Sequence, residues 1–242
     1  MQLSIVIPAW NEEKLLPATL SAIGHAAETS LAPAGISWEV IVCDNNSTDS
    51  TSALARAAGA NVVFEPVNQI GRARNTGASA ARGDWILFVD ADSHPSPALF
   101  ADLAAVLQDA TVLGGGSLLR METEHPGARF ILGFWGFISR RLKYAAGSFL
   151  FVRTGAFRES GGFDPAFFAA EEIDLSKRLK KIARRRRQRF IILSRHPLET
   201  SARKLTMHSA TTHFAFMLRT ALTGGRTLRR KEACAIWYDG QR

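Results

Sequence analysis

The chain has 242 residues, of which 46% are hydrophobic and 21% are charged. This length and composition exclude a disordered tail and a mini-protein, because the chain can bury a sizeable core. The formal net charge of +8 comes largely from one stretch, Lys177 to Arg189, which holds nine basic residues and no acidic residue.

Two cysteines, Cys43 and Cys234, are too few for a disulfide framework, so a reducing compartment fits the chain. The N-terminus carries no visible export signal. The longest apolar run, Phe130 to Ile138, has nine residues, about half of the roughly 20 that a bilayer-crossing helix needs. We therefore expect a cytoplasmic protein without a membrane span.

Short apolar runs alternate with helical patterns in the first half of the chain. Strands are predicted over 3–7, 38–43, 62–64 and 85–89, with helices after the second strand and over 71–82. Asn46, Ser47 and Asp49 are expected to cap the first of these helices, and Gly59 to end it. The alternation predicts an α/β fold with a mainly parallel, Rossmann-like sheet flanked by helices, whose ligands lie beyond the carboxyl ends of the strands.

The pattern is looser after about residue 110. Strands predicted over 117–121 and 148–152 are followed by a basic helix over 173–183 and a strand over 189–193. Because no linker separates the two halves, we expect a single domain with a basic C-terminal extension.

Two carboxylates, Asp90 and Asp92, directly follow the predicted strand over 85–89. At a strand end both could address one hard cation, since Mg²⁺ and Mn²⁺ take oxygen ligands and complete their shells with phosphate and water. The pair predicts a metal–diphosphate site. The alternative is that both residues cap the next helix, whose start is marked by Pro95 and Pro97.

Other polar groups also stand at strand and helix ends. Asp44 ends the second predicted strand and could bind a nucleobase or ribose, or could cap a turn. After the first strand, Trp10 could stack on a base that Glu12 orients, or could be a core aromatic. Arg72 and Arg74 open the predicted helix over 71–82, where phosphate oxygens or plain solvent could surround them.

Taken in order, these segments resemble family 2 glycosyltransferases, which are inverting nucleotide-sugar transferases of the GT-A fold. The resemblance is carried by SIVIPAWNEE (4–13), VIVCDNNSTD (40–49), GRARNTG (71–77) and FVDAD (88–92). It continues at GGFD (161–164) and EEIDL (171–175), and it spans most of residues 3–204.

The resemblance implies a domain over 1–204, with a nucleotide-sugar-binding half at 1–110, an acceptor-binding half at 111–204 and a helical extension at 205–242. It also implies roles toward a nucleoside-diphosphate sugar and a divalent metal, Mn²⁺ or Mg²⁺. The nucleoside would lie at Pro8, Ala9, Glu12 and Asp44, the diphosphate at Arg72 or Arg74, and the ribose and metal at Asp90, Ala91 and Asp92, with Asp92 as metal ligand.

The acceptor side departs from the family in one residue. The family motif usually begins Glu-Asp, whereas this chain has Glu171-Glu172. An inverting displacement needs one base facing away from the departing diphosphate, and we expect Glu172 to be that base, with Asp174 as the alternative. These acids could instead only stabilise a helix N-terminus. Residues 161–164 are expected to form a flexible acceptor-side loop.

Two further site residues follow from the resemblance. The segment 196–204 is similar to one that closes over the diphosphate in relatives, so Arg203 could pair with phosphate and His196 could be a further metal ligand. A solvated arginine and a surface histidine are the alternatives.

The basic stretch suggests a partner. Together with the apolar run at 130–138 and the basic residues of 140–143, it predicts peripheral contact with an anionic membrane at the inner face of the cell membrane. An acceptor hydroxyl on a lipid or lipid-linked molecule would fit that contact. Core packing of the aromatics and a solvated helix end are the alternatives.

Two other functions fit less well. A nucleic-acid-binding module would leave Asp44, Asp90 and Asp92 without a role, and the basic run lacks interleaved aromatics for base stacking. A nucleotidyltransferase would need a glycine-rich loop after the first strand, and 8–13 contains no glycine. The sequence therefore favours sugar transfer to a hydroxyl acceptor, with no nucleic acid as partner.

Overall fold

The structure, a computed structural model, describes residues 1–120, 136, 139–200, 220, 223, 226–230 and 232–234. Within these residues one eight-stranded sheet has the strand order β3-β2-β1-β4-β7-β6-β8-β5. The strands are β1 (Gln2–Ala9), β2 (Ser37–Asp44), β3 (Asn61–Phe64), β4 (Trp85–Val89), β5 (Ser93–His94), β6 (Val112–Arg120), β7 (Phe149–Arg153) and β8 (Arg189–Thr200). The helices are α1 (Leu16–Ala26), α2 (Thr51–Ala57), α3 (Ile70–Ser79), α4 (Pro97–Leu107), α6 (Thr154–Ser160) and α7 (Glu171–Arg185).

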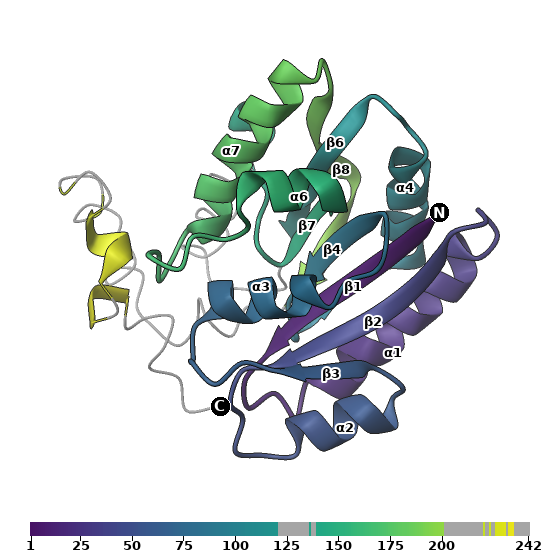
Figure 1. The fold of residues 1–242 in the computed structure, drawn as a ribbon. Helices are drawn as coiled ribbons and strands as arrows, with labels where there is room; N and C mark the ends of the chain where they lie inside the picture. The colour runs from purple at the N-terminus through teal and green to yellow at the C-terminus, as the bar shows by residue number, and fades with distance from the viewer. Residues whose placement is uncertain are drawn as a thin grey trace.

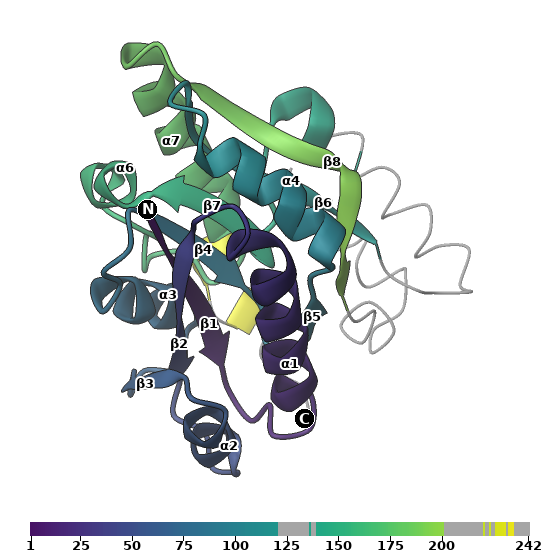
Figure 2. The ribbon, with the colours of Figure 1, turned by 90° about the vertical axis from the view of Figure 1, so that its right-hand side faces the viewer.

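The sheet is mainly parallel, as the sequence predicts. Strands β1 to β4 run in one direction, β7 is antiparallel to β4 and to β6, and β8 is parallel to β6. Figures 1 and 2 show helices α3, α6 and α7 on one side of the sheet and α1 and α4 on the other. The expected α/β class with helices on both faces is confirmed.

Each face of the sheet has its own hydrophobic core because side chains alternate along a strand. Leu3, Ile5 and Ile7 of β1 face the core that packs against α1 and α4. Val6 faces the other core, which includes Leu175 and other apolar residues of α7. These two cores fix the carboxyl ends of β1, β2 and β4 at one edge of the sheet.

Several elements differ from the sequence prediction. The helix expected over 71–82 is α3, which ends at Ser79, and the strand expected over 117–121 is β6, which begins at Val112. The glycines 114–116, expected in a loosened region, lie inside β6, where a Cβ at Gly115 would stand 2.1 Å from the carbonyl oxygen of Ile191. Strand β8 continues beyond the predicted end at Leu193, through a register shift against β6 that contains Pro197. A bulge tolerates proline, which a regular ladder does not.

The capping prediction for the helix that follows β2 was only partly right. Gly59 follows the helix with a left-handed φ of +81°, as expected. Helix α2, however, begins at Thr51, and its N-cap residue Ser50 makes no side-chain cap bond. Asp49 instead accepts a hydrogen bond from the amide of Thr51 at 2.9 Å, so the three predicted residues form the turn before the helix.

Some sequence-based expectations concern segments of which the structure describes only a few residues. None of the helices formed by the described residues is long and apolar enough to cross a membrane. Apart from Gly136, the apolar run 130–138 lies outside the described residues. The described part of 205–242 includes two 3₁₀ turns, Arg226–Arg229 and Glu232–Cys234, and the division of the chain at 110 and 204 stays a prediction.

Candidate active site

The predicted nucleoside residues gather where β1 and β2 end. Pro8 is opposite Cys43 and Ala9 is opposite Asp44 in the parallel register. The amide of Asn45 donates to the carbonyl of Ala9 at 2.8 Å, which ties the two strand ends together. The carboxylate of Asp44 accepts from the amide of Ser47 at 2.9 Å, so the turn-capping alternative describes one of its contacts.

Glu12 lies in the turn that leads from β1 into α1. Its backbone amide donates to the hydroxyl of Thr51 at 2.8 Å, and its carbonyl accepts from the amides of Leu15 and Leu16. Asn11, immediately before it, has a left-handed φ of 53° that turns the chain. Glu12 is therefore held at the same edge of the sheet as Asp44.

Asp90, Ala91 and Asp92 form the turn between β4 and β5. The carbonyl of Asp90 accepts from the amide of Ser93 at 3.2 Å, and the carbonyl of Ala91 accepts from Thr19 at 2.7 Å. The helix-capping alternative for these aspartates is wrong, because the hydroxyl of Ser96 caps α4 by accepting from the amide of Leu99.

Arg74 connects this turn to the acceptor side. Its Nη2 donates to Oδ1 of Asp90 at 2.8 Å and its Nη1 donates to Oε1 of Glu171 at 2.6 Å. Its side chain is 2% exposed, and both of these carboxylates stand against its guanidinium. Arg72, the other arginine expected at the diphosphate, is 40% exposed and pairs with Glu65 at 3.1 Å.

The guanidinium of Arg74 is enclosed by backbone and ring atoms. It lies 5.3 Å from the ring centroid of Phe163. A Cβ at Gly147, in the segment before β7, would stand 2.5 Å from Nη2 of Arg74. In this position the guanidinium would have to shift if residue 147 carried a side chain.

Glu172 stands beside these charges in the first turn of α7. Burial raises the pKa of Glu172 to about 8, the neighbouring carboxylates of Glu171 and Asp90 act in the same direction, and Arg74 opposes them. A carboxyl with a pKa near neutrality can accept and release a proton during a reaction.

Asp174, the alternative base, is engaged with another residue. Its Oδ2 accepts from Nε of Arg178 at 2.8 Å. Arg178 also donates to the carbonyl of Gly162 at 2.7 Å and to that of Ser160. Asp174 and Arg178 thus hold the loop 161–164 against α7. Within this loop, the carboxylate of Asp164 accepts a hydrogen bond from the amide of Ala166 at 2.9 Å, as a turn residue does.

Three amide side chains that sequence reasoning missed organise the site. Asn45 contacts the backbone of Glu65, Val67 and Gln69. Gln69 donates to the carbonyls of Pro165 and Phe167, and Asn75 bonds both the amide and the carbonyl of Phe163. Asn45 and Asn75 belong to the motifs already quoted, but an uncharged amide gives no chemical signal of its own.

The structure describes only one of the two site residues that were expected in the segment 196–204. His196 lies in the bulged part of β8, where its Nδ1 is 2.9 Å from Oδ2 of Asp102 on α4. With Nδ1 engaged, only Nε2 could bind a metal. Arg203 lies outside the described residues.

The Asp90–Asp92 turn offers two carboxylates, the ligand type that a divalent metal prefers, but no complete metal site of its own. Among the described residues, no group of three or more His, Cys, Asp or Glu side chains could hold a metal ion. Asp90 has one carboxylate oxygen on Arg74 and a side chain that is still 18% exposed. Two carboxylates suffice for Mg²⁺ or Mn²⁺ when phosphate and water supply the remaining ligands.

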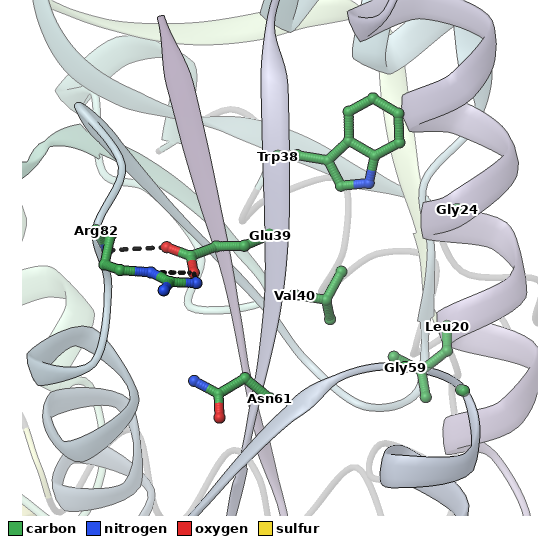
Figure 3. A pocket seen from close by; sticks show the side chains of 9 residues that line it. Leu20, Gly24, Trp38, Glu39, Val40, Gly59, Asn61 and Arg82 are labelled. Atoms are coloured by element: carbon green, nitrogen blue, oxygen red, sulfur yellow. Dashed lines mark hydrogen bonds and ion pairs between the residues drawn. The ribbon is translucent and has the colours of Figure 1, made fainter.

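A pocket of about 410 Å³ lies elsewhere, around Trp38 and Val40 of β2 and Leu20 of α1. Figure 3 shows Trp38 and Val40 on one side of the strand and the Glu39–Arg82 pair on the other. Trp38 is near the start of β2, whereas Asp44 ends it. The pocket is therefore remote from the predicted site.

Comparison with known proteins adds sequence relatives. The family model described as glycosyl transferase family 2 matches residues 4–158. An uncharacterized glycosyltransferase of Mycobacterium tuberculosis, Rv0539, is 39% identical over 104 residues, which cover 41% of this chain and 43% of that relative. The dolichyl-phosphate beta-glucosyltransferase of Mus musculus is 35% identical over 100 residues, 38% of this chain and 31% of that protein. The matches thus span less than half of each relative.

Solved structures share the fold. TarS 1-349 of S. aureus, in complex with UDP-GlcNAc, matches with a TM-score of 0.64 and 21% identity over 83% of this chain and 58% of that one. Glucosyl-3-phosphoglycerate synthase of M. tuberculosis, in complex with Mn²⁺, UDP and glucosyl-3-phosphoglycerate, matches with a TM-score of 0.59 and 23% identity over 80% and 70% of the two chains. The predicted GT-A type of α/β fold is confirmed.

Proposed function

Because the chain belongs to glycosyl transferase family 2, we propose that it transfers a sugar from a nucleoside-diphosphate sugar to an acceptor hydroxyl with inversion at the anomeric carbon. One observation carries the proposal. Arg74 joins Asp90, on the donor side, to Glu171, on the acceptor side, through two buried ion pairs. Glu172, the next residue, is thereby held close to the turn where the diphosphate would lie.

The donor would lie at the carboxyl ends of β1 and β2. Pro8, Ala9, Glu12 and Asp44 share that edge, and we assign them to the nucleoside. The partly exposed guanidinium of Arg72 is the better candidate for the diphosphate, since Arg74 is enclosed. UDP and UDP-GlcNAc complexes of proteins with this fold support a uridine nucleotide as the first donor to test.

Asp90 and Asp92 would hold a divalent cation together with the donor. When bound, such a cation offsets the negative charge that develops on the departing diphosphate, so no acid needs to protonate the leaving group. The Mn²⁺ complex of a protein with the same fold supports testing this ion first.

Glu172 would act as the base. In a direct displacement the acceptor oxygen forms a bond to the anomeric carbon, the bond to the diphosphate oxygen breaks, and the hydroxyl proton moves to a carboxylate oxygen of Glu172. Asp174 is the weaker candidate because Arg178 occupies its carboxylate. Glu171 and Arg74 would position α7, and neither would touch the reacting atoms.

The test is turnover of UDP- and GDP-sugars, with and without Mn²⁺, by the wild type and by Asp92→Asn. We expect metal-dependent turnover that Asp92→Asn lowers by about 100-fold or more. Asp109→Asn is the matched control, because that carboxylate pairs with Arg189 at the start of β8, outside the candidate site, and should leave turnover unchanged. Metal-independent turnover that survives Asp92→Asn would contradict the proposed role of the acidic pair.

A further inference from the structure

The basic residues of α7 divide into two faces. Arg178 pairs with Asp174, while Arg185 and Arg186 both pair with Glu159 of α6. The remaining cations of the helix are Lys177, Lys180, Lys181 and Arg184. No described carboxylate forms an ion pair with any of these four, which we call the basic stripe.

The spacing of the basic stripe puts its members on one helix face. The four residues stand at positions i, i+3, i+4 and i+7, which lie above one another on an α-helix. The opposite face carries Leu175, Leu179 and Ile182 in the hydrophobic core. Two pairs of like charges therefore stand four residues apart on the solvent side, an arrangement that is destabilising without an anionic partner.

The segment before β7 extends this surface. Nζ of Lys180 lies 4.0 Å from the ring centroid of Tyr144 and donates to the carbonyl of Leu142 at 2.7 Å. Nζ of Lys177 lies 6.0 Å from the same centroid, so two ammonium groups stand over one ring. Burial, Lys177 and Lys143 all lower the pKa of Lys180. Leu142, which directly precedes Lys143, is 48% exposed.

We propose that the basic stripe, with Lys143 and Leu142, docks on an anionic lipid bilayer. Several cations on one face suit acidic headgroups, and an exposed leucine among them can enter the boundary between headgroups and acyl chains. Nucleic acid fits this surface less well, because Lys180 covers the Tyr144 ring on which a base would have to stack.

Docking would also orient the candidate site. Lys177 and Arg184 follow Glu172 by about 7.5 Å and about 18 Å along the axis of α7, at 1.5 Å per residue. A bilayer against the basic stripe would therefore lie along the helix that carries the proposed base. Membrane binding itself is independent of sugar transfer, so failure of either proposal leaves the other standing.

The test is flotation of the full chain with vesicles of phosphatidylglycerol and phosphatidylcholine, and with vesicles of phosphatidylcholine alone. We expect binding only to the anionic vesicles, weakening as salt rises. The combined change Lys177→Gln, Lys180→Gln and Lys181→Gln should weaken it by about 100-fold, at about fivefold per cation. Arg185→Gln, Arg186→Gln and Arg189→Gln together remove the same charge from residues that are already ion-paired, and should weaken it far less.

Two further variants keep the test decisive if the glutamine variant misfolds. Changing the three lysines to arginine keeps the charge and should keep vesicle binding, and Leu142→Ser should weaken it several-fold. The proposal would be overturned if the two glutamine variants lost vesicle binding equally, or if neither variant lost it. It would also be overturned if the wild type bound no vesicles, or bound duplex RNA in place of vesicles.

Discussion

Arg74 and Glu171 stand 97 residues apart in the sequence, and their side chains meet at 2.6 Å between Nη1 and Oε1. The same guanidinium holds Asp90 at 2.8 Å. Because Arg74 is only 2% exposed, water screens neither ion pair effectively. The two halves of the candidate site are thus joined by one buried side chain.

Removing this side chain should destabilise the fold. Arg74→Met leaves Asp90 and Glu171 without their buried partner, which is expected to lower the free energy of unfolding by about 3–5 kcal/mol. Arg82→Met is the control, because that guanidinium is 75% exposed in its pair with Glu39 and should cost at most about 1 kcal/mol. Denaturant unfolding of both variants measures the difference, and equal losses would contradict a special role for Arg74.

Gly147→Ala should disturb the same bridge from the other side. The new Cβ would stand 2.5 Å from Nη2 of Arg74, and the guanidinium cannot move away without losing Asp90 or Glu171. We expect a loss of about 1–3 kcal/mol in unfolding free energy and reduced turnover. Gly24→Ala is the control, since nothing lies within 4 Å of its Cβ position in α1, and alanine should stabilise that helix by about 0.5–1 kcal/mol. If Gly147→Ala lowered neither the unfolding free energy nor turnover, the guanidinium of Arg74 would not be tightly enclosed.

Glu172 should make stability fall as pH rises. Its pKa is raised from 4.5 to about 8 in the folded state, so the folded chain binds this proton more tightly than the unfolded chain. The stability that the proton contributes is present at low pH and is lost as pH rises from about 4.5 to about 8. The gain in Tm of Glu172→Gln over the wild type should therefore grow from pH 5 to pH 8. Glu28→Gln, which removes an exposed carboxyl, should show no such trend, and a constant gain for Glu172→Gln would contradict the raised pKa.

The rate of donor turnover should depend on the same proton of Glu172. Stability should fall as pH rises, whereas the rate should increase. Only the deprotonated carboxylate of Glu172 can take a proton, so kcat/KM for donor turnover should rise with pH, reach half its maximum near pH 8 and level off above that pH. A profile already flat above pH 5 would mean that Glu172 is ionised throughout or is not the base. Measuring kcat/KM from pH 5 to 9 distinguishes these outcomes.

Much of the fold was predictable from local pattern. Strand β4 has the predicted bounds, Trp85–Val89, because a continuous apolar run flanked by polar residues is typical of a buried parallel strand. Strand β8 was predicted too short, since a bulge at Pro197 depends on the register against β6. Register is a property of two strands and is not visible in one of them.

The candidate site was predictable in its residues more than in its contacts. Arg72 and Arg74 stand two positions apart, which places them about 200° apart around a helix at 3.6 residues per turn. The motif therefore predicts two arginines at one helix start, but only the packing of Phe163 and Gly147 decides that Arg74 is the buried one. Asn75, which bonds the backbone of Phe163, was missed for the same reason.

The most direct measurement compares donor binding with donor turnover in Glu172→Gln. Glutamine keeps the shape of the side chain and removes the base. The account predicts that titration calorimetry gives a Kd for the UDP-sugar within about twofold of the wild type, while turnover falls by about 10²–10⁴-fold. Turnover close to that of the wild type, in a folded variant that still binds the donor, would contradict the assignment of Glu172 as the base.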